Sequence, residues 1–369
     1  MSVHRRTLRD DERRAWLRLA RTESIGPITF AALLARFPDP REALEEAPRL
    51  ARRGGGNMKI PSDSDAAREL DSIGAQSGQV IASVEPDFPV GLSALEPPPP
   101  LITVFGDTAL LKREMVAVVG ARNASGLGIK FARRIAQDLG ASGFVVASGM
   151  ARGIDAAAHD GALATGTVAV LGGGPDIIYP PENRSLYGAL REKGAVISEM
   201  ALGTAPLARH FPRRNRIVSG LSRGVVVIEA AERSGSLITA NFALEQGREV
   251  FAVPGSPLDP RAKGTNRLIR DGATLTESAE DVLSVLAPIL AGRFTASPDE
   301  PRVEEHTVPD RDVDRVRRLV EEKLSPAPIE TDELIRQCDA PAAAVLTVLL
   351  ELELAGRVSR HSGNRVCWR

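Results

Sequence analysis

The residues with the clearest chemical potential lie between positions 205 and 216, a stretch with four arginines, one histidine and no acidic residue. Guanidinium groups bind phosphates, and Phe211 stands among them as a ring on which a base can stack. This pattern is typical of a surface that follows the backbone of a single nucleic-acid strand. The alternative is a solvated charged face, although such a face usually mixes both signs. The candidate residues are Arg209, Phe211, Arg213, Arg214, Asn215 and Arg216.

Polar and glycine-rich turns follow several expected strands. The first turn reads GARNASGLG from Gly120 to Gly128, which is not the GxGxxG spacing of a dinucleotide site. Its amides and the helix that follows favour an anion, and Arg122 adds donors; alternatively, the glycines only make a tight turn. In the third turn, Tyr179 and Asn183 either contact a sugar or base, or only lead into and cap the next helix. The remaining candidates in these turns are Ser148, Gly149, Arg152, Gly172, Gly173, Gly174 and, as an anion-binding nest, Ser234, Gly235, Ser236 and Thr239.

Asp155 and His159 form an acid–imidazole pair at helical spacing. They stand four residues apart in the segment GIDAAAH, so they share one helix face. A catalytic pair is one interpretation, but no nucleophile accompanies it. We expect a structural hydrogen bond between the two side chains and no catalytic residues.

Composition excludes several classes of protein. The net charge is −1 over 369 residues, so the chain is not a generally basic coat protein. The histidines are scattered and Cys338 and Cys367 form no CxxC motif, so we expect neither a metal site nor a disulfide. The N-terminus lacks the apolar stretch of a signal peptide, and no apolar run approaches the roughly 20 residues of a membrane helix. These features predict a cytoplasmic protein without a membrane segment.

The central part of the chain predicts the fold that positions these residues. Strand-like runs at 115–120, 143–148, 167–171, 194–198, 224–229 and 249–253 alternate with helix-like runs at 128–139, 153–163, 183–192, 214–221 and 236–246. Such alternation indicates an α/β fold, a Rossmann-like parallel sheet with helices on both faces. Ligands of such sheets bind at the carboxyl ends of the strands, where the candidate residues stand.

The flanking segments predict smaller domains. Residues 1–77 are helical, and the break at Gly26-Pro27 fits either a helix-hairpin-helix or a plain helical hairpin in a small SAM-like domain. The proline run at 96–101 indicates a boundary. Residues 288–310 have the composition of a linker, and residues 311–369 read as three helices and a hairpin, the winged-helix pattern. The Rossmann-like domain is then 78–287.

The turns, taken in order, closely resemble those of the DprA/Smf family. The matching runs are VVGARNASGLG, ASGMARGIDAAAH, VLGGGPDIIYPPEN, HFPRRNRIVSGLS, VVVIEAAERSGSLITANFALEQGREVFAVPG and KGTNRLIRDGA, between about residues 100 and 275. The chain departs from the family pattern by Ala121 in place of serine before Arg122, and by Arg152 where lysine is also usual. Both changes spare the charge.

The resemblance implies a protein that binds DNA and catalyses no reaction. Members of this family bind and protect incoming single-stranded DNA, help to load RecA on strands covered by single-strand-binding protein, and serve natural transformation. They act as homodimers through the Rossmann-like domain and need no cofactor. The resemblance places DNA at Arg122, at Phe211 with its arginines, and at the pocket loops Gly172–Gly174 and Ser234–Ser236; it suggests residues 236–253 for the dimer.

Two rival interpretations remain open at this point. The fold also resembles the lysine-decarboxylase-like phosphoribohydrolases, nucleotide-hydrolysing enzymes in which Glu199, Glu229 or Glu245 would act as the acid or base. Against them, Ser234-Gly235-Ser236-Leu237 replaces their Pro-Gly-Gly-x-Gly-Thr loop. The other rival is a winged-helix regulator that binds duplex DNA through residues 311–369.

Overall fold

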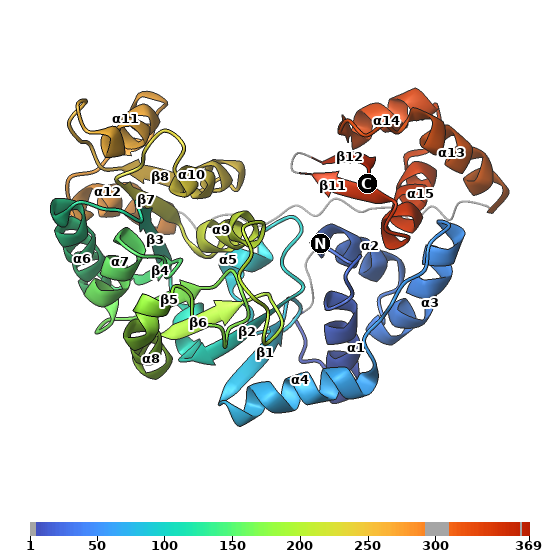
Figure 1. Cartoon of the computed structure of the whole chain (residues 1–369), viewed down its shortest axis with the longest axis horizontal. Helices are drawn as coiled ribbons and strands as arrows, with labels where there is room; N and C mark the ends of the chain where they lie inside the picture. The colour runs from blue at the N-terminus through green and yellow to red at the C-terminus, as the bar shows by residue number, and fades with distance from the viewer. Residues whose placement is uncertain (1–4, 292–309, 362–363) are drawn as a thin grey trace. The chain divides into compact units, whose positions relative to one another are not determined.

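The computed structural model describes residues 5–291, 310–361 and 364–369. They divide into two compact units (Figure 1). One unit holds Leu8–Ala67 together with the C-terminal residues from 310 on, and the other holds residues 68–291 with residues 5–7. Among the described residues, none of the helices has both the length and the apolar character needed to cross a membrane.

The larger unit is built on a nine-stranded sheet, counted over the described residues. Its order is β1-β2-β6-β5-β4-β3-β7-β8-β9, and every neighbouring pair from β6 to β9 is parallel. The six strands expected from the sequence are confirmed. The bounds are β1 Gly78–Ala82, β2 Leu101–Gly106, β3 Met115–Gly120, β4 Val145–Ser148, β5 Thr167–Val170, β6 Ala195–Ser198, β7 Gly224–Ile228, β8 Glu249–Ala252 and β9 Thr274–Leu275.

Two antiparallel strands at one edge of the sheet were not predicted. Strand β1 pairs with β2 in antiparallel register, with Ile81 opposite Ile102, and β2 pairs with β6 in the same way. The proline run at 96–101 therefore lies in the connection between two paired strands, and the boundary expected there is wrong. Prolines cannot donate to a ladder, but here they precede β2, in the connection from the edge strand β1.

Helices cover both faces of the sheet, as predicted. Along β3, Met115, Ala117 and Val119 face one core while Val116 and Val118 face the other, because side chains alternate along a strand. Helices α5 (Val90–Ser93), α9 (His210–Leu221) and α10 (Gly235–Glu245) cover the first face; α6 (Gly126–Ala141), α7 (Ile154–Ala162) and α12 (Ala279–Ala291) cover the second. The other helical elements are α8 (Arg184–Lys193), α11 (Lys263–Arg270) and the short 3-10 turns Thr108–Lys112, Pro181–Asn183 and Pro260–Ala262.

The smaller unit combines the two ends of the chain. Its N-terminal helices are α1 (Asp10–Ala20), α2 (Pro27–Arg36), α3 (Pro40–Arg53) and the start of α4 (Asp63–Ala75). The C-terminal part has α13 (Asp310–Lys323), α14 (Thr331–Cys338), α15 (Ala342–Leu354) and the strands β10 (Ile329–Glu330), β11 (Val358–His361) and β12 (Arg365–Trp368), which confirms the winged helix. Of the expected linker, residues 288–291 belong to α12, and residues 292–309 lie outside the described residues.

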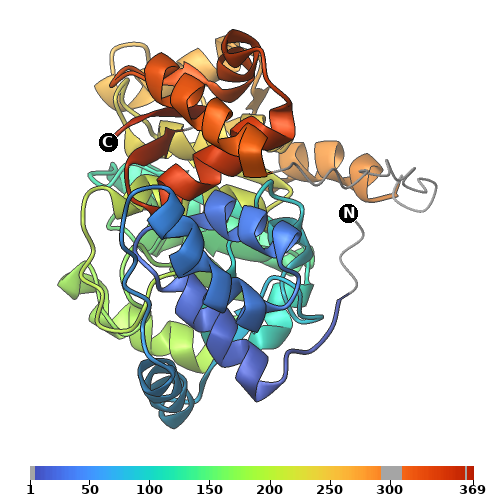
Figure 2. The same ribbon diagram turned by 90° about the vertical axis from the view of Figure 1, so that its right-hand side faces the viewer.

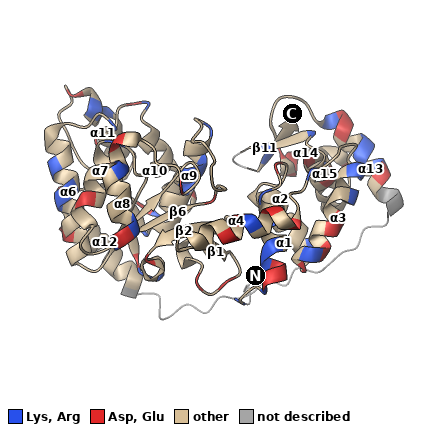
Figure 3. Ribbon diagram, turned by 60° about the horizontal axis from the view of Figure 1, so that its bottom comes forward, with Lys and Arg blue, Asp and Glu red and all other residues tan. Residues whose placement is uncertain are grey.

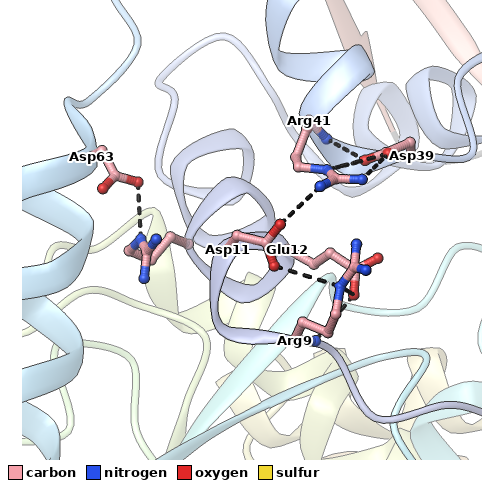
Figure 4. Close-up of polar contacts among 7 residues, drawn as sticks. Arg9, Asp11, Glu12, Asp39, Arg41 and Asp63 are labelled. Atoms are coloured by element: carbon pink, nitrogen blue, oxygen red, sulfur yellow. Dashed lines mark hydrogen bonds and ion pairs between the residues drawn. The ribbon is translucent and has the colours of Figure 1, made fainter.

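An ionic network joins the N-terminal helices. Arg41, in the first turn of α3, contacts Asp39 at 2.6 Å and reaches Asp11 of α1 at 2.8 Å (Figure 4). Hydrogen bonds from Arg41 lower the pKa of the Asp39 carboxyl to about 2. In the same view Arg9 contacts Glu12, and Asp63 at the start of α4 accepts from Arg14 of α1. Charged pairs therefore connect α1 with both α3 and α4.

Helix α15 holds the two ends of the chain together. One side packs in the winged-helix core through residues such as Val348 and Leu352. On the other side Thr29 of α2 donates to the buried Glu353 carboxylate at 2.9 Å, across 324 residues of sequence. Figures 1 and 2 show α15 beside α2 and α3. In a winged helix the third helix is the one that enters the DNA groove; here that helix packs against the N-terminal helices.

The first winged-helix segment also lacks a basic face. Figure 3 shows both charge signs mixed along α13, whose sequence is DRDVDRVRRLVEEK. In the wing, Arg360 pairs with Glu353, and Arg357 pairs with Glu321 while its guanidinium lies over the Trp368 ring. These contacts disfavour the duplex-binding regulator considered from the sequence.

The contact between α3 and α15 can be tested at Gly54. This residue has an ordinary helical backbone, but a Cβ there would lie 2.1 Å from the Glu351 carbonyl oxygen. We expect Gly54→Ala to lower the free energy of unfolding by about 1–3 kcal/mol, the usual effect of overpacking. Hydrogen exchange of the α15 amides and thermal unfolding measure it. Gly74→Ala in α4, where a Cβ meets nothing within 4 Å, is the matched control; equal stability of both variants would contradict the packing.

Candidate nucleic-acid interface

Three neighbouring strands bring the predicted turns to one edge of the sheet. Strands β3, β4 and β5 are parallel neighbours, so Gly120, Ser148 and Val170 end at the same rim. Helix α9 leads down to the start of β7, which places its first turn, beginning at His210, at this rim as well. Segments from four different turns of the sequence therefore meet in one place.

A pocket of about 170 Å³ lies where these segments meet. Arg122 stands over the Phe211 ring, with its guanidinium carbon 5.3 Å from the ring centroid. The Tyr179 ring lies 5.9 Å from that of Phe211, tilted by 47°, and Tyr179 is 45% exposed. We call this site the rim pocket; its lining residues are Arg122, Gly149, Ala151, Arg152, Tyr179, Pro180, Pro181, Glu182, Phe211 and Arg214.

Arg214 forms the floor of the rim pocket and is buried. Its Nη1 donates to the Val170 carbonyl at 3.2 Å, and a Cβ on Gly149 would lie 1.4 Å from the same nitrogen. Gly149 is thus required by the guanidinium rather than by a ligand. Burial lowers the pKa of Arg214 and raises that of the buried Asp155 carboxyl, while the attraction between the two groups opposes both shifts. Arg214 is therefore a structural cation beneath the exposed Arg122.

The remaining arginines of α9 do not form one unneutralised cluster. Glu199, just beyond β6, pairs with Arg216 and lies 3.5 Å from Arg213. The segment 205–216 contains no acidic residue in sequence, but the fold places the Glu199 carboxylate, from the end of β6, beside its arginines. Arg209 and the outer side of Arg213 are exposed beside the rim pocket. No acidic residue stands in the first turn of α9, so its positive helix end adds to their field.

Several predicted residues serve the fold and do not face the pocket. Ser148 is fully buried and donates to the Val118 carbonyl at 2.6 Å. Ser236 and Thr239 are buried in the first turns of α10, and Ser234 caps that helix at the Ser236 amide. One hydroxyl therefore caps the helix and the other two are inside, whereas the anion-binding nest expected at this turn stays a prediction.

Other predicted residues hold the loops around the rim pocket. Asn183 donates from Nδ2 to the Met150 carbonyl at 2.9 Å, so it fixes the turn after β4. Asn215 donates to the Gly235 carbonyl at 3.2 Å. A Cβ on Gly172 would touch the Phe211 ring at 3.3 Å, and one on Gly173 or Gly174 would meet the carbonyl of Thr204 or Ala201. At Gly120 it would meet the Ile228 carbonyl. These glycines allow close packing of the backbone behind the pocket.

The sequence missed part of the rim. Ala151, Pro180, Pro181 and Glu182 line the pocket, and the exposed Glu182 lies 3.6 Å from Arg152. Pro180 and Pro181 directly follow Tyr179, which was predicted to be in the site, so their position in the sequence could have indicated that they line the same pocket. The partners Asp155 and Glu199 come from other turns, and only the folded chain brings them to the arginines.

The expected hydrogen bond between Asp155 and His159 is wrong. Asp155 accepts from the Ala151 amide at 3.2 Å, and His159 Nδ1 pairs with the Thr167 hydroxyl at 2.7 Å. Both side chains are buried, but they bond in different directions along α7. Desolvation, with a smaller contribution from Arg214, lowers the pKa of His159 to about 3, so its ring is neutral. In the described ranges no group of three or more metal-ligating side chains gathers.

Family models and a curated relative match each part of the chain. The family model "DNA recombination-mediator protein A" matches residues 79–287, "DprA-like N-terminal HHH domain" matches 10–72, and "DprA winged helix domain" matches 304–364. Protein Smf of Escherichia coli is 40% identical over 286 residues, which are 76% of this chain and 74% of that protein.

Two solved structures of DNA processing protein A are also similar to this chain. The DNA processing protein A (DprA) of Streptococcus pneumoniae aligns with a TM-score of 0.61 and 34% identity, over 73% of this chain and 95% of that one. The Helicobacter pylori DNA processing protein A, described with a single-stranded DNA binding mode, aligns with a TM-score of 0.52 and 27% identity, over 57% and 96%.

The buried neutral imidazole predicts an acid-sensitive fold. The unfolded chain takes up a proton at His159 near pH 6.5, whereas the folded chain does so only near pH 3. Stability is therefore complete above pH 6.5 and is lost as the pH falls, by about 2 kcal/mol at pH 5. Urea unfolding of wild type and His159→Asn at pH 7.5 and pH 5 measures this. We expect the variant to be less stable at both but to lose about 2 kcal/mol less on acidification; equal losses would refute a buried neutral ring.

Proposed function

The chain belongs to the DprA/Smf family of DNA-processing proteins, and we propose that it binds single-stranded DNA at the rim pocket and holds the strand without chemical change. The contact that carries the proposal is Arg122 over the half-buried ring of Phe211, beside the exposed Tyr179. Aromatic rings that stack bases, next to guanidinium groups that bind phosphates, suit a flexible single strand. The binding mode named for the Helicobacter pylori relative supports the same ligand.

The distribution of charge supports a strand and disfavours an enzyme. Arg122 and Arg152 are exposed at the rim, whereas the buried charges of Arg214 and Asp155 offset each other beneath it. The acids that hydrolysis would need are engaged or remote: Glu199 pairs with arginines, and Glu245 is exposed at the end of α10. Of the predicted contacts, Arg122, Arg152, Tyr179, Arg209, Phe211 and Arg213 remain our proposed DNA-binding side chains.

The wider role follows from the family. We propose that the protein acts in the cytosol, protects an incoming strand, and helps RecA to displace single-strand-binding protein from it. The Streptococcus pneumoniae and Bacillus subtilis relatives named DNA processing protein DprA, together with the family model named for DNA recombination, support a role in DNA processing and recombination. We also propose three domains: a helical domain at 1–77, the Rossmann-like domain at 78–287 and the winged helix at 311–369. The linker 288–310 joins the last two.

We also propose a homodimer through α10. The exposed side of α10, whose sequence is GSLITANFALE, carries Ile238 and Leu244 beside Asn241 and Glu245. Ile238 and Leu244 are 39% and 61% exposed. Two exposed apolar side chains on one side of a helix suit contact with a second copy of the chain. Residues 236–245 fall in the segment 236–253 that the family resemblance suggested, whereas β8 lies between β7 and β9 and is not part of the proposed surface.

The DNA site predicts a defined response to mutation. We expect wild type to bind a labelled oligo-dT more tightly than duplex of the same length, and more weakly as salt rises. Phe211→Ala should cost about 1–3 kcal/mol of binding free energy, and Arg122→Ala should also reduce the salt slope by about 1. Fluorescence anisotropy over a salt series measures both.

The control is Arg133→Ala, an exposed arginine of α6 that pairs with Asp160 outside the rim pocket. Phe211→Leu separates the ring from its apolar volume and should resemble the alanine variant. Preference for duplex, or wild-type affinity in both pocket variants, would overturn the proposal and direct attention to the winged helix.

The dimer predicts a separate result. Leu244→Glu places a charge on the outer face of α10 and should convert the dimer to a monomer in light scattering coupled to gel filtration. Leu258→Glu, at a residue 92% exposed elsewhere on the same unit, is the control. A dimer that survives Leu244→Glu would locate the interface elsewhere.

A further inference from the structure

A second, larger cavity lies on the other side of the first glycine turn. It has a volume of about 510 Å³, within the range of small-molecule sites. Strands β3, β7 and β8 end at it, and β3 is the strand at which the chain order of the sheet reverses. Open α/β sheets bind their ligands at such a point. The lining is mainly apolar, with Leu127, Phe131, Val253, Pro254 and Ala262 among its residues.

The anion position at this cavity is filled by the chain itself. Glu229, the residue after β7, has a left-handed backbone with φ of 51°, rare for a residue with a side chain. Its carboxylate accepts from the Ser125 amide at 2.8 Å and from the Ser125 hydroxyl, at the N-terminus of α6. A Cβ on Gly128 would lie 2.7 Å from that carboxyl group, so glycine makes the room.

This arrangement selects the kind of ligand. Phosphates bind the positive ends of helices, but here a carboxylate already holds that place and repels a second anion. Each carboxylate oxygen keeps a lone pair beyond its bond to Ser125, so the group can still accept hydrogen bonds. An apolar cavity with a carboxylate acceptor fits a flat, uncharged group that carries N–H donors.

The second cavity and the rim pocket lie at the same turn. Arg122 lines the rim pocket and Ser125 lines the second cavity, and both belong to the turn after β3. Three residues span at most roughly 11 Å, so a strand held at Arg122 reaches the second cavity with its next nucleotides. The exposed Lys130 and Arg134 stand at the lining, where cations can meet the backbone phosphates of that strand.

We propose that the second cavity is a base pocket of the same DNA strand, in which Glu229 accepts a hydrogen bond from the amino group of an unstacked base. The inference rests on the proposed function, since the strand must first occupy the rim pocket. Cytosine offers its N4 amino group to a carboxylate. Thymine has no amino group; its one N–H donor, N3–H, lies between two carbonyl oxygens, which a carboxylate repels. The protein then prefers amino-bearing bases at this position.

The test compares labelled oligo-dC and oligo-dT of equal length by fluorescence anisotropy at one salt concentration. Glu229→Gln keeps the size and one acceptor but removes the charge, and we expect it to lower the preference for dC over dT by about fivefold or more. Glu232→Gln is the matched control, an exposed carboxylate 4.0 Å from Lys263 and outside both cavities. Lys130→Ala should weaken dC and dT equally and reduce the salt slope by about 1.

The outcomes separate the inference from the proposed function. If Arg122→Ala weakens binding but neither Glu229→Gln nor Lys130→Ala changes it, the second cavity is not on the strand and the inference fails alone. If Arg122→Ala has no effect either, the proposed function fails. Thermal unfolding checks that Glu229→Gln is folded; if it is not, a wild-type response of Lys130→Ala overturns the inference.

Discussion

The rim depends on one buried guanidinium, that of Arg214. It lies beneath the ends of β4 and β5, bonds the Val170 carbonyl, and excludes any side chain at Gly149. A buried cation persists only with compensating partners, and the carboxylate of Asp155 in α7 provides the opposite charge. The same guanidinium lies 5.9 Å from the Phe211 centroid, so the ring above it has a fixed support. Through these contacts Arg214 fixes helix α9 relative to the turns after β4 and β5 and to helix α7 on the other face of the sheet.

This constraint explains why one run of arginines has several roles. Helix α9 begins at His210, four residues earlier than its sequence indicated. With that start, the positions 210, 214, 217, 218 and 221 form the inner face by helical spacing and are buried. A helix predicted to start at residue 210 would have placed Arg214 on the buried side. The pairing of Arg213 and Arg216 with Glu199 could not be predicted in this way, because that carboxylate comes from the end of another strand.

The sheet itself was largely predictable, and the packing of the two chain ends was not. Parallel strands buried on both faces leave continuous apolar runs, and all six such runs are strands. Strands β1 and β2 were missed for other reasons: β1 is the outermost strand, and β2, although apolar, directly follows a run of four prolines. In the smaller unit, the glycines at 54 and 56 are closely packed only because the backbone of α15 lies against them. Nothing near residue 54 in the sequence indicates this contact, and Thr29 meets Glu353 from the opposite end of the chain.

The turn after β3 presents opposite charges on its two sides. On one side it exposes Arg122 beside aromatic rings; on the other, Ser125 holds a carboxylate in the place where a dinucleotide would put its phosphates. A single strand presents phosphates and bases repeatedly along its length, so successive nucleotides can place phosphates at the cationic side of the turn and bases at the carboxylate side. The opposite charges on the two sides of one turn therefore suit the proposed strand.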